Sequence, residues 1–232
     1  MSSNYLVEYL QIFNTLITVL LNLSPVFVLI PVMKGKHDYR NVPFLMLIFN
    51  LLNGICWGCY WYKMSFTTPL ISNILCSLIS STFCLIYLFY LAKKIVQKFF
   101  LYIMILIIIS SIIIYISIYV INFQLFGRIL IFINILLFIG PGQNIVRVIK
   151  EKNYKLIPIV TTIVSIIASG GWLLFGIIIN DLNCIIPNFI GLGFSIFNTF
   201  IWLFYYLREK IQKNKNKFYS EENIDNNKVE IK

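Results

Sequence analysis

The same three residue types recur in this chain at a period of 115 or 116 residues. They are Pro25, Trp57 and Asn73 in the first copy and Pro141, Trp172 and Asn188 in the second. The tryptophan precedes the asparagine by 16 residues in both copies, so the internal spacing is kept. A repeat of this length in an apolar chain indicates a duplicated helical bundle, with a binding site where the two halves meet.

Composition places this duplication in a membrane. Hydrophobic residues make up 59% of the chain and charged residues 12%, whereas a soluble domain is about a quarter charged. The net charge of +10 could suggest nucleic acid as a partner, but the basic residues lie between apolar runs and at the C-terminus. We therefore expect a polytopic membrane protein, with the lipid bilayer and not nucleic acid as its partner.

Seven apolar runs are long enough to cross a bilayer, which takes about 20 residues. They span residues 7–32, 43–62, 66–92, 99–121, 126–149, 156–179 and 184–207. The predicted fold class is therefore an all-α membrane protein with seven transmembrane helices. The polar tail, residues 208–232, lacks apolar mass for a core, and we expect it to be disordered.

The distribution of lysine and arginine predicts the orientation. Seventeen of the 19 basic residues fall on one side of this topology, and only Lys63 and Arg128 fall on the other. Basic loops stay in the cytosol, so we expect a cytosolic C-terminus and an extracellular or lumenal N-terminus. The first residues carry Glu8 and no basic cluster, so we expect no cleaved signal peptide.

The fourth span explains how the two copies fit together. Residues 1–98 hold the first three-helix repeat and residues 122–207 hold the second. A three-helix unit ends on the side opposite to its start, so the extra crossing at 99–121 restores the orientation. The sequence predicts two parallel three-helix bundles joined by a linker helix, a 3+1+3 arrangement about a pseudo-two-fold axis along the membrane normal.

Helix geometry brings four of the repeated side chains to one depth. At a rise of about 1.5 Å per residue, Trp57 and Asn73 reach the same level from opposite ends of their helices, and the second copy repeats this with Trp172 and Asn188. Indole faces suit the C–H side of a sugar, and uncharged amides suit its hydroxyls. The structural alternatives are interhelical hydrogen bonds for the asparagines and core packing for the tryptophans.

Four prolines also recur between the copies. Pro43 and Pro158 stand where helices begin, a position that tolerates proline, whereas Pro25 and Pro141 lie inside spans and predict kinks. These kinks are structural features, hinges that let each bundle rock, or both.

The residues that are missing also restrict the function. No Asp, Glu, Lys or His lies deep in a predicted span, although carriers driven by protons or sodium usually need one. The sequence contains no P-loop, no nucleophile–base set and no metal-ligand cluster. We therefore expect passive transport by a protein that is not an enzyme and that has no cofactor, no metal and no catalytic residue.

Together these motifs resemble the SWEET family of sugar facilitators, eukaryotic relatives of the bacterial semiSWEETs and of PQ-loop proteins. The resemblance covers about residues 7–207. It rests on SPVFVLIPVMKGKHDYRNVPF and LLNGICWGCYWY in the first copy and on GPGQNIVRVIKEKNYKLIPI and IPNFIGLGFSIFNTFIWLFYY in the second. Neither repeat carries the Pro-Gln dipeptide, because Val26 follows Pro25 and Gly142 follows Pro141.

The resemblance implies bidirectional sugar uniport by alternating access. Asn73 and Asn188 match the pocket asparagines of the family, Trp172 matches a pocket tryptophan, and the four prolines match its proline tetrad. The resemblance further implies that Tyr60 and Asp181 close the outer gate. Trp57 stands where many plant members carry a smaller residue, so we expect a tighter pocket that favours monosaccharides such as glucose over sucrose.

Other readings stay open from the sequence. They are a PQ-loop carrier of another small solute such as an amino acid, a seven-span receptor and a non-transporting scaffold. The plasma membrane is our first expectation for the location, and endomembranes are the alternative. The resemblance also implies that copies of the chain can assemble as homo-oligomers.

Overall fold

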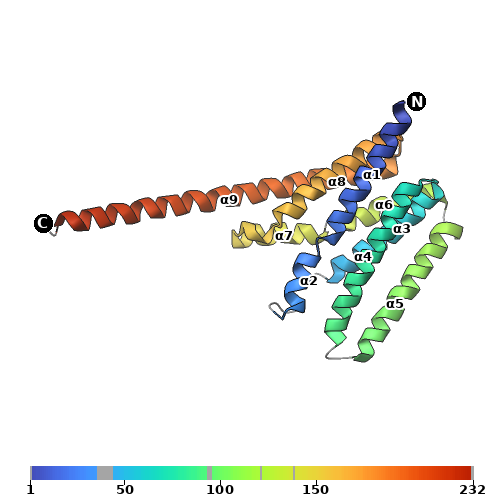
Figure 1. Cartoon of the computed structure of the whole chain (residues 1–232), viewed down its shortest axis with the longest axis horizontal. Helices are drawn as coiled ribbons and strands as arrows, with labels where there is room; N and C mark the ends of the chain where they lie inside the picture. The colour runs from blue at the N-terminus through green and yellow to red at the C-terminus, as the bar shows by residue number, and fades with distance from the viewer. Residues whose placement is uncertain (1, 36–43, 93–95, 121, 138, 231–232) are drawn as a thin grey trace.

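The computed structural model describes residues 2–35, 44–92, 96–120, 122–137 and 139–230. The described residues form helices joined by short turns (Figure 1). In chain order these are α1 (Ser2–Leu23), α2 (Val26–Met33), α3 (Phe44–Lys63), α4 (Thr67–Ala92), α5 (Val96–Tyr115), the π-helix η2 (Ile116–Val120), α6 (Phe123–Leu137), α7 (Ile139–Glu151), the 3₁₀-helix η3 (Tyr154–Leu156), α8 (Ile159–Ile178) and α9 (Leu182–Glu230).

The helices follow the predicted spans. Five of the described helices, in α1, α4, α5–η2, α8 and α9, are long and apolar enough to cross a membrane. The second span is α3, whose 20 residues include polar and small side chains. The first span is divided into two helices, α1 and α2, and the fifth span is described as α6 and α7 on either side of residue 138. The predicted all-α membrane fold is confirmed.

The repeated prolines stand at or next to helix starts. Pro25 is the N-cap of α2, directly after the break that ends α1, and Pro158 is the N-cap of α8. Pro141 lies in α7, three residues after residue 138, which is outside the described residues. Pro43 lies outside the described residues, immediately before α3.

Helix neighbours show the duplication directly. Within the first half α3 packs on α4 and α4 on α1, and within the second half α8 packs on α9 and α9 on α6. Between the halves α1 packs on α8 and α6 packs on α3. Exchanging the two halves maps this set of contacts onto itself, as a pseudo-two-fold axis requires. The linker helix α5 packs on α3 and α4, so it belongs with the first half.

The turns that follow α3 and α8 have the same backbone geometry. Ser65 and Asn180 are 115 residues apart, and their φ angles are 59° and 55°. The next residue donates its N–H five residues back in both turns, from Phe66 to the Trp61 carbonyl at 3.0 Å and from Asp181 to the Gly176 carbonyl at 2.9 Å. These bonds satisfy carbonyls at the helix ends. Phe66 and Asp181 are therefore structural equivalents.

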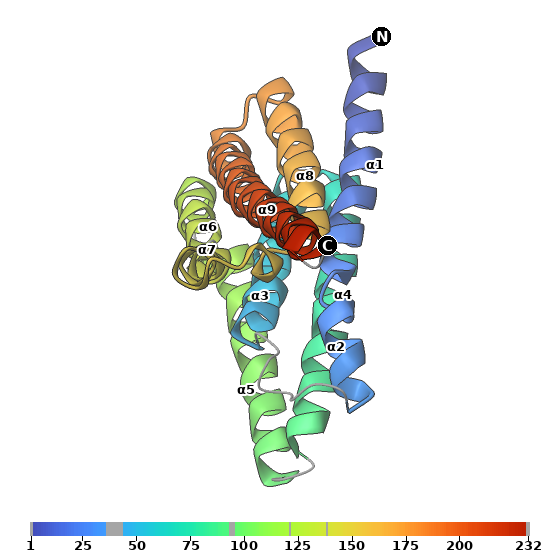
Figure 2. The same ribbon diagram turned by 90° about the vertical axis from the view of Figure 1, so that its left-hand side faces the viewer.

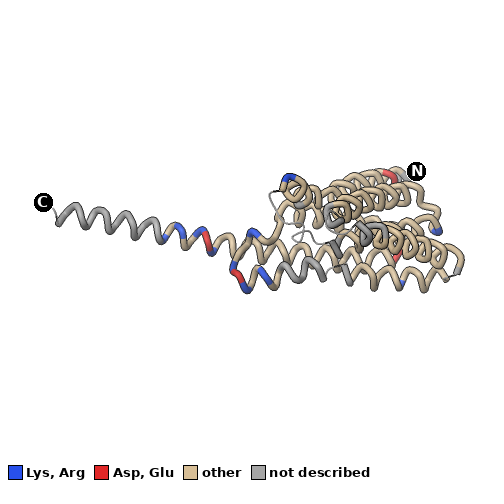
Figure 3. Tube along the Cα trace, turned by 90° about the horizontal axis from the view of Figure 1, so that it is seen from below, with Lys and Arg blue, Asp and Glu red and all other residues tan. Residues whose placement is uncertain are grey.

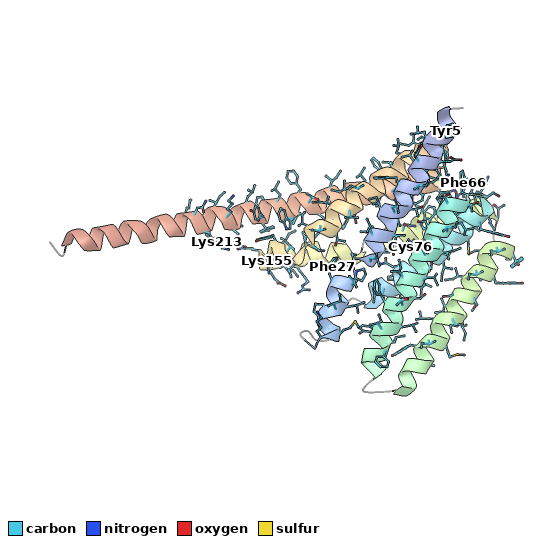
Figure 4. All side chains as sticks on the ribbon, in the orientation of Figure 1. Tyr5, Phe27, Phe66, Cys76, Lys155 and Lys213 are labelled. Atoms are coloured by element: carbon cyan, nitrogen blue, oxygen red, sulfur yellow. The ribbon has the colours of Figure 1, made fainter. Side chains whose placement is uncertain are left out.

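The two halves converge at one end of the bundle and spread apart toward the other (Figures 1 and 2). The end where they converge carries the N-terminus and the turns after α3 and α8, and we call it the turn end. Lys155 and Lys213 lie at the opposite end, which we call the basic end, whereas Tyr5 and Phe66 lie at the turn end (Figure 4).

One expectation about the tail is corrected. The sequence predicts disorder from residue 208, but the structure continues α9 to Glu230. The segment after 207 holds six Lys and four Glu, which have high helix propensity, beside five Asn, which do not. Glu209 and Lys213 form an i, i+4 ion pair with 2.6 Å between Oε1 and Nζ, the spacing and orientation that support a helix. Low apolar content therefore did not prevent helix formation here.

Candidate functional site

Three indole rings form a column across the interface between the halves. The Trp57 and Trp61 ring centroids are 5.5 Å apart with 23° between the planes, and those of Trp61 and Trp172 are 6.0 Å apart with 22°. Trp61 is 1% exposed and lies between the two predicted site tryptophans. Trp57 and Trp172 thus belong to one aromatic unit and are joined through Trp61. Sequence comparison of the repeats missed Trp61 because its equivalent in the second copy is Gly176.

In the first half, Asn73 lies at the level of Trp57, as the helix rise predicts. A Cβ added to Gly58, the residue after Trp57, would lie 3.8 Å from the Asn73 Cβ. A Cβ added to Gly54, one turn earlier, would collide with Ser77 and lie 3.3 Å from the Asn73 carbonyl oxygen. The two glycines therefore let α3 and α4 approach closely, and this contact holds Asn73 beside Trp57.

In the second half, Cys184 links Asn188 to Trp172. The Asn188 amide donates to the Cys184 carbonyl at 2.8 Å, and the Cys184 thiol donates to the Trp172 carbonyl at 3.4 Å. The Trp172 indole Nε1–H donates to the Thr18 hydroxyl of α1 at 2.8 Å, which fixes the ring by a contact from the other half.

The two site asparagines are held in the same way. Asn73 donates to the Pro69 carbonyl at 2.9 Å, four residues back, as Asn188 does to that of Cys184. Each amide uses one of its two N–H groups in this bond. At Asn73 the second N–H and the carbonyl oxygen remain for another partner. At Asn188 the amide nitrogen also lies 3.7 Å from the Cys184 sulfur, a weak acceptor, and the carbonyl oxygen remains. Both side chains are partly exposed, so a polar ligand can reach them.

The predicted gate residues contact each other directly. The Tyr60 hydroxyl lies 2.9 Å from both carboxylate oxygens of Asp181 and donates to them. Tyr60 is fully buried and Asp181 is 7% exposed. Because the bond joins α3 to the start of α9, it ties the first half to the second at the turn end.

A third residue, Asn183, completes this gate network. Its side-chain N–H donates to the Tyr60 hydroxyl at 3.1 Å, and its backbone N–H donates to Asp181 Oδ1 at 3.1 Å. The side chain sits against Gly127 of α6, where any Cβ would collide with it. The sequence did not single out Asn183, although its position two residues after an acidic residue at a helix start is typical of a capping turn.

The pseudo-two-fold axis relates the Tyr60–Asp181 contact to a purely aromatic one. Phe175 is the equivalent of Tyr60, and Phe66 is the equivalent of Asp181. Their rings meet edge to face, with centroids 5.7 Å apart and 79° between the planes. Phe66 lies at the turn end (Figure 4). The halves are therefore joined twice at this end, once by hydrogen bonds and once by an edge-to-face ring contact.

Comparison with known proteins agrees with this architecture. Residues 124–210 match the family model described as "Sugar efflux transporter for intercellular exchange". Sugar transporter SWEET1 of Xenopus tropicalis is 25% identical over 179 residues, which cover 75% of this chain and 81% of that protein. The bidirectional sugar transporter SWEET10 of Arabidopsis thaliana is 23% identical over 194 residues, covering 78% of this chain and 64% of that protein.

Along most of its length the chain is similar to sugar transporters named SWEET, at 23–25% identity for these two relatives. A solved structure of a eukaryotic SWEET transporter superposes with a TM-score of 0.79 at 18% identity, and the match covers 88% of this chain and 99% of that one. The SWEET fold thus extends over the whole bundle, including the first half that lies outside the family-model match.

Proposed function

We propose that this protein carries small neutral sugars passively and in both directions across a membrane. The observation that carries the proposal is the uncharged layer of indoles and amides between the two halves, closed toward the turn end by the gate network. The names of its relatives, sugar transporters and bidirectional sugar transporters, point to the same substrate class.

The chemistry of the layer suits a sugar. Binding sites for small molecules combine apolar surfaces with a few placed polar groups. Trp57 and Trp172 supply flat faces for the C–H side of a pyranose, and Asn73 and Asn188 each offer a donor and an acceptor for hydroxyls. No charged side chain is needed, which matches an uncharged substrate.

The shape of the bundle supports alternating access. The halves touch at the turn end through the gate network and spread toward the basic end (Figure 1), so this conformation is closed on one side. Opening that side requires the Tyr60–Asp181 bond to break while the halves rock about their shared interface. We assign the hinges of this motion to the helix starts at Pro25, Pro43, Pro141 and Pro158.

The basic end faces the cytosol in our proposal. Lys and Arg among the described residues gather there, around the α7–α8 connection and the beginning of the α9 extension (Figure 3). This matches the rule that basic residues stay in the cytosol. The gate network then closes the extracellular or lumenal side. We propose the plasma membrane as the location.

We further propose a preference for monosaccharides. Trp57 is 7% exposed and has one face against Trp61, so the indole fills space that a smaller residue would leave to the substrate. We therefore expect a hexose to be carried better than a disaccharide.

The test is sugar uptake in cells that lack their own hexose transport, with surface abundance measured in parallel. We expect glucose uptake above background, lower sucrose uptake, and a loss of about tenfold or more for Asn188→Ala, because buried amide bonds to a ligand are lost. Asn198→Ala is the matched control, because Asn198 lies on the same helix and also donates to a carbonyl four residues back, at 3.2 Å. Absence of uptake by wild type at the cell surface, or equal losses in both variants, would contradict the proposal.

A further inference from the structure

A polar stripe runs along the buried face of α1. It consists of Gln11, Asn14, Thr15 and Thr18, at the i, i+3, i+4 and i+7 spacing that places side chains on one helix face. Gln11 is 7% exposed and Asn14 is fully buried. Since α1 packs on α8 and α4, the stripe lies inside the protein and not against lipid.

Asn14 has no hydrogen-bond partner within the part of the chain that the structure describes. Both its amide nitrogen and its amide oxygen are buried and unpaired, and so is the Thr15 hydroxyl. The amide lies against Gly171 of α8, where any Cβ would collide with it. One helical turn further along α1, Thr18 accepts the hydrogen bond of the Trp172 indole. Asn14 therefore lies at the interface of the halves, beside the candidate sugar layer.

The second half shows what packing alone requires at this position. The equivalents of Asn14 and Gly171 are Leu130 of α6 and Cys56 of α3, on two helices that pack on each other. Leu130 is fully buried and Cys56 is 2% exposed, and both belong to the apolar core. An apolar side chain thus closes this interface in one half, whereas the other half buries an amide whose desolvation is not compensated.

We propose that Asn14 is a sugar-binding residue, whose amide exchanges hydrogen bonds with a substrate hydroxyl when α1 and α8 separate at the turn end. The inference rests on the proposed sugar transport and adds to it a polar contact from α1. In the closed conformation the Asn14 amide lies beside Trp172 without a hydrogen-bond partner among the described residues. In the open conformation the same amide faces the entering sugar, one turn closer to the turn end than Thr18.

The test is counterflow of glucose and of its 2-, 3- and 6-deoxy analogues in proteoliposomes. Wild type should carry at least one deoxy sugar about five- to tenfold less well than glucose, the size expected for one neutral hydrogen bond. Asn14→Leu, which copies the apolar residue of the second half, should slow glucose by about the same factor and abolish discrimination against that one analogue. Asn14→Ser, a smaller variant whose hydroxyl can still donate and accept a hydrogen bond, should retain part of the discrimination.

Asn198→Leu is the control for loss of a buried asparagine, because Asn198 is 7% exposed and bonds within its own helix. It should slow all four sugars by a common factor. The inference is overturned if Asn14→Leu does the same, if Asn14→Leu leaves glucose counterflow unchanged, or if wild type discriminates against none of the analogues. Absence of glucose counterflow by wild type would instead refute the proposed sugar transport itself.

Discussion

The two halves of this protein share a backbone plan and differ in the chemistry of their contacts. Both turns at the turn end have the same φ angle and hydrogen bonds. At equivalent positions, however, Tyr60 meets Asp181 while Phe175 meets Phe66. Duplication thus fixed where the halves touch, and later divergence made one contact polar and the other aromatic. The polar contact can exchange its hydrogen bonds for water on opening, whereas the aromatic contact loses only packing.

Removing the Tyr60 hydroxyl should produce the largest effect. Tyr60→Phe leaves the buried Asp181 carboxylate without its side-chain donor, and a hydrogen bond to a charged group contributes about 1.5–3 kcal/mol. The closed conformation should lose about ten- to a hundredfold in relative population. Labelling of Cys184, which is 1% exposed behind the gate, by a water-soluble maleimide should accelerate accordingly.

Tyr62→Phe is the control for this experiment, because Tyr62 lies on the same helix and is 59% exposed. It should label at the wild-type rate. Equal Cys184 labelling in wild type and Tyr60→Phe would show that the gate network does not hold the closed conformation.

The aromatic contact should matter less. Phe66→Leu keeps an apolar side chain and removes the edge-to-face pair with Phe175, which contributes about 0.5–1.5 kcal/mol. We expect Cys184 labelling to accelerate by about two- to tenfold. A larger effect from Phe66→Leu than from Tyr60→Phe would reverse our ranking of the two contacts.

Asn183 should have a smaller effect than Tyr60, of about the same size as that of the aromatic contact. Asn183→Ala removes the donor to the Tyr60 hydroxyl but keeps the backbone N–H that binds Asp181. One neutral hydrogen bond contributes about 0.5–1.5 kcal/mol, so a change of a few-fold in labelling is expected. In a double-mutant cycle with Tyr60→Phe the two changes should not add, because both remove the same bond. Additive effects would place Asn183 outside the gate network.

Much of this architecture could be predicted from the sequence, because residue spacing determines depth along a helix. Apolar runs gave the spans, and the helix rise placed Asn73 beside Trp57. Rotation about the helix axis and the choice of neighbours are not determined by spacing. Trp61 and Asn183 were missed for that reason, since neither has a matching residue in the other copy and only tertiary contacts reveal their roles.

The tail and the linker show a second limit. Composition measures whether a segment can bury apolar surface, but the segment after residue 207 extends an existing helix and needs no nucleation of its own. Two parallel three-helix repeats require an extra membrane crossing between them, but this requirement does not determine which half the extra helix packs against. Packing of α5 on α3 and α4 decides that.

Counterflow by purified protein tests the central claim most directly. Proteoliposomes are loaded with unlabelled glucose and diluted into labelled glucose, with no gradient of protons or sodium. The account predicts transient accumulation of label inside the vesicles for wild type and for Asn198→Ala. For Asn188→Ala it predicts accumulation that is lower by about tenfold or more. Wild-type accumulation that appears only with an ion gradient, or equal accumulation in all three proteins, would contradict passive sugar transport through the indole and amide layer.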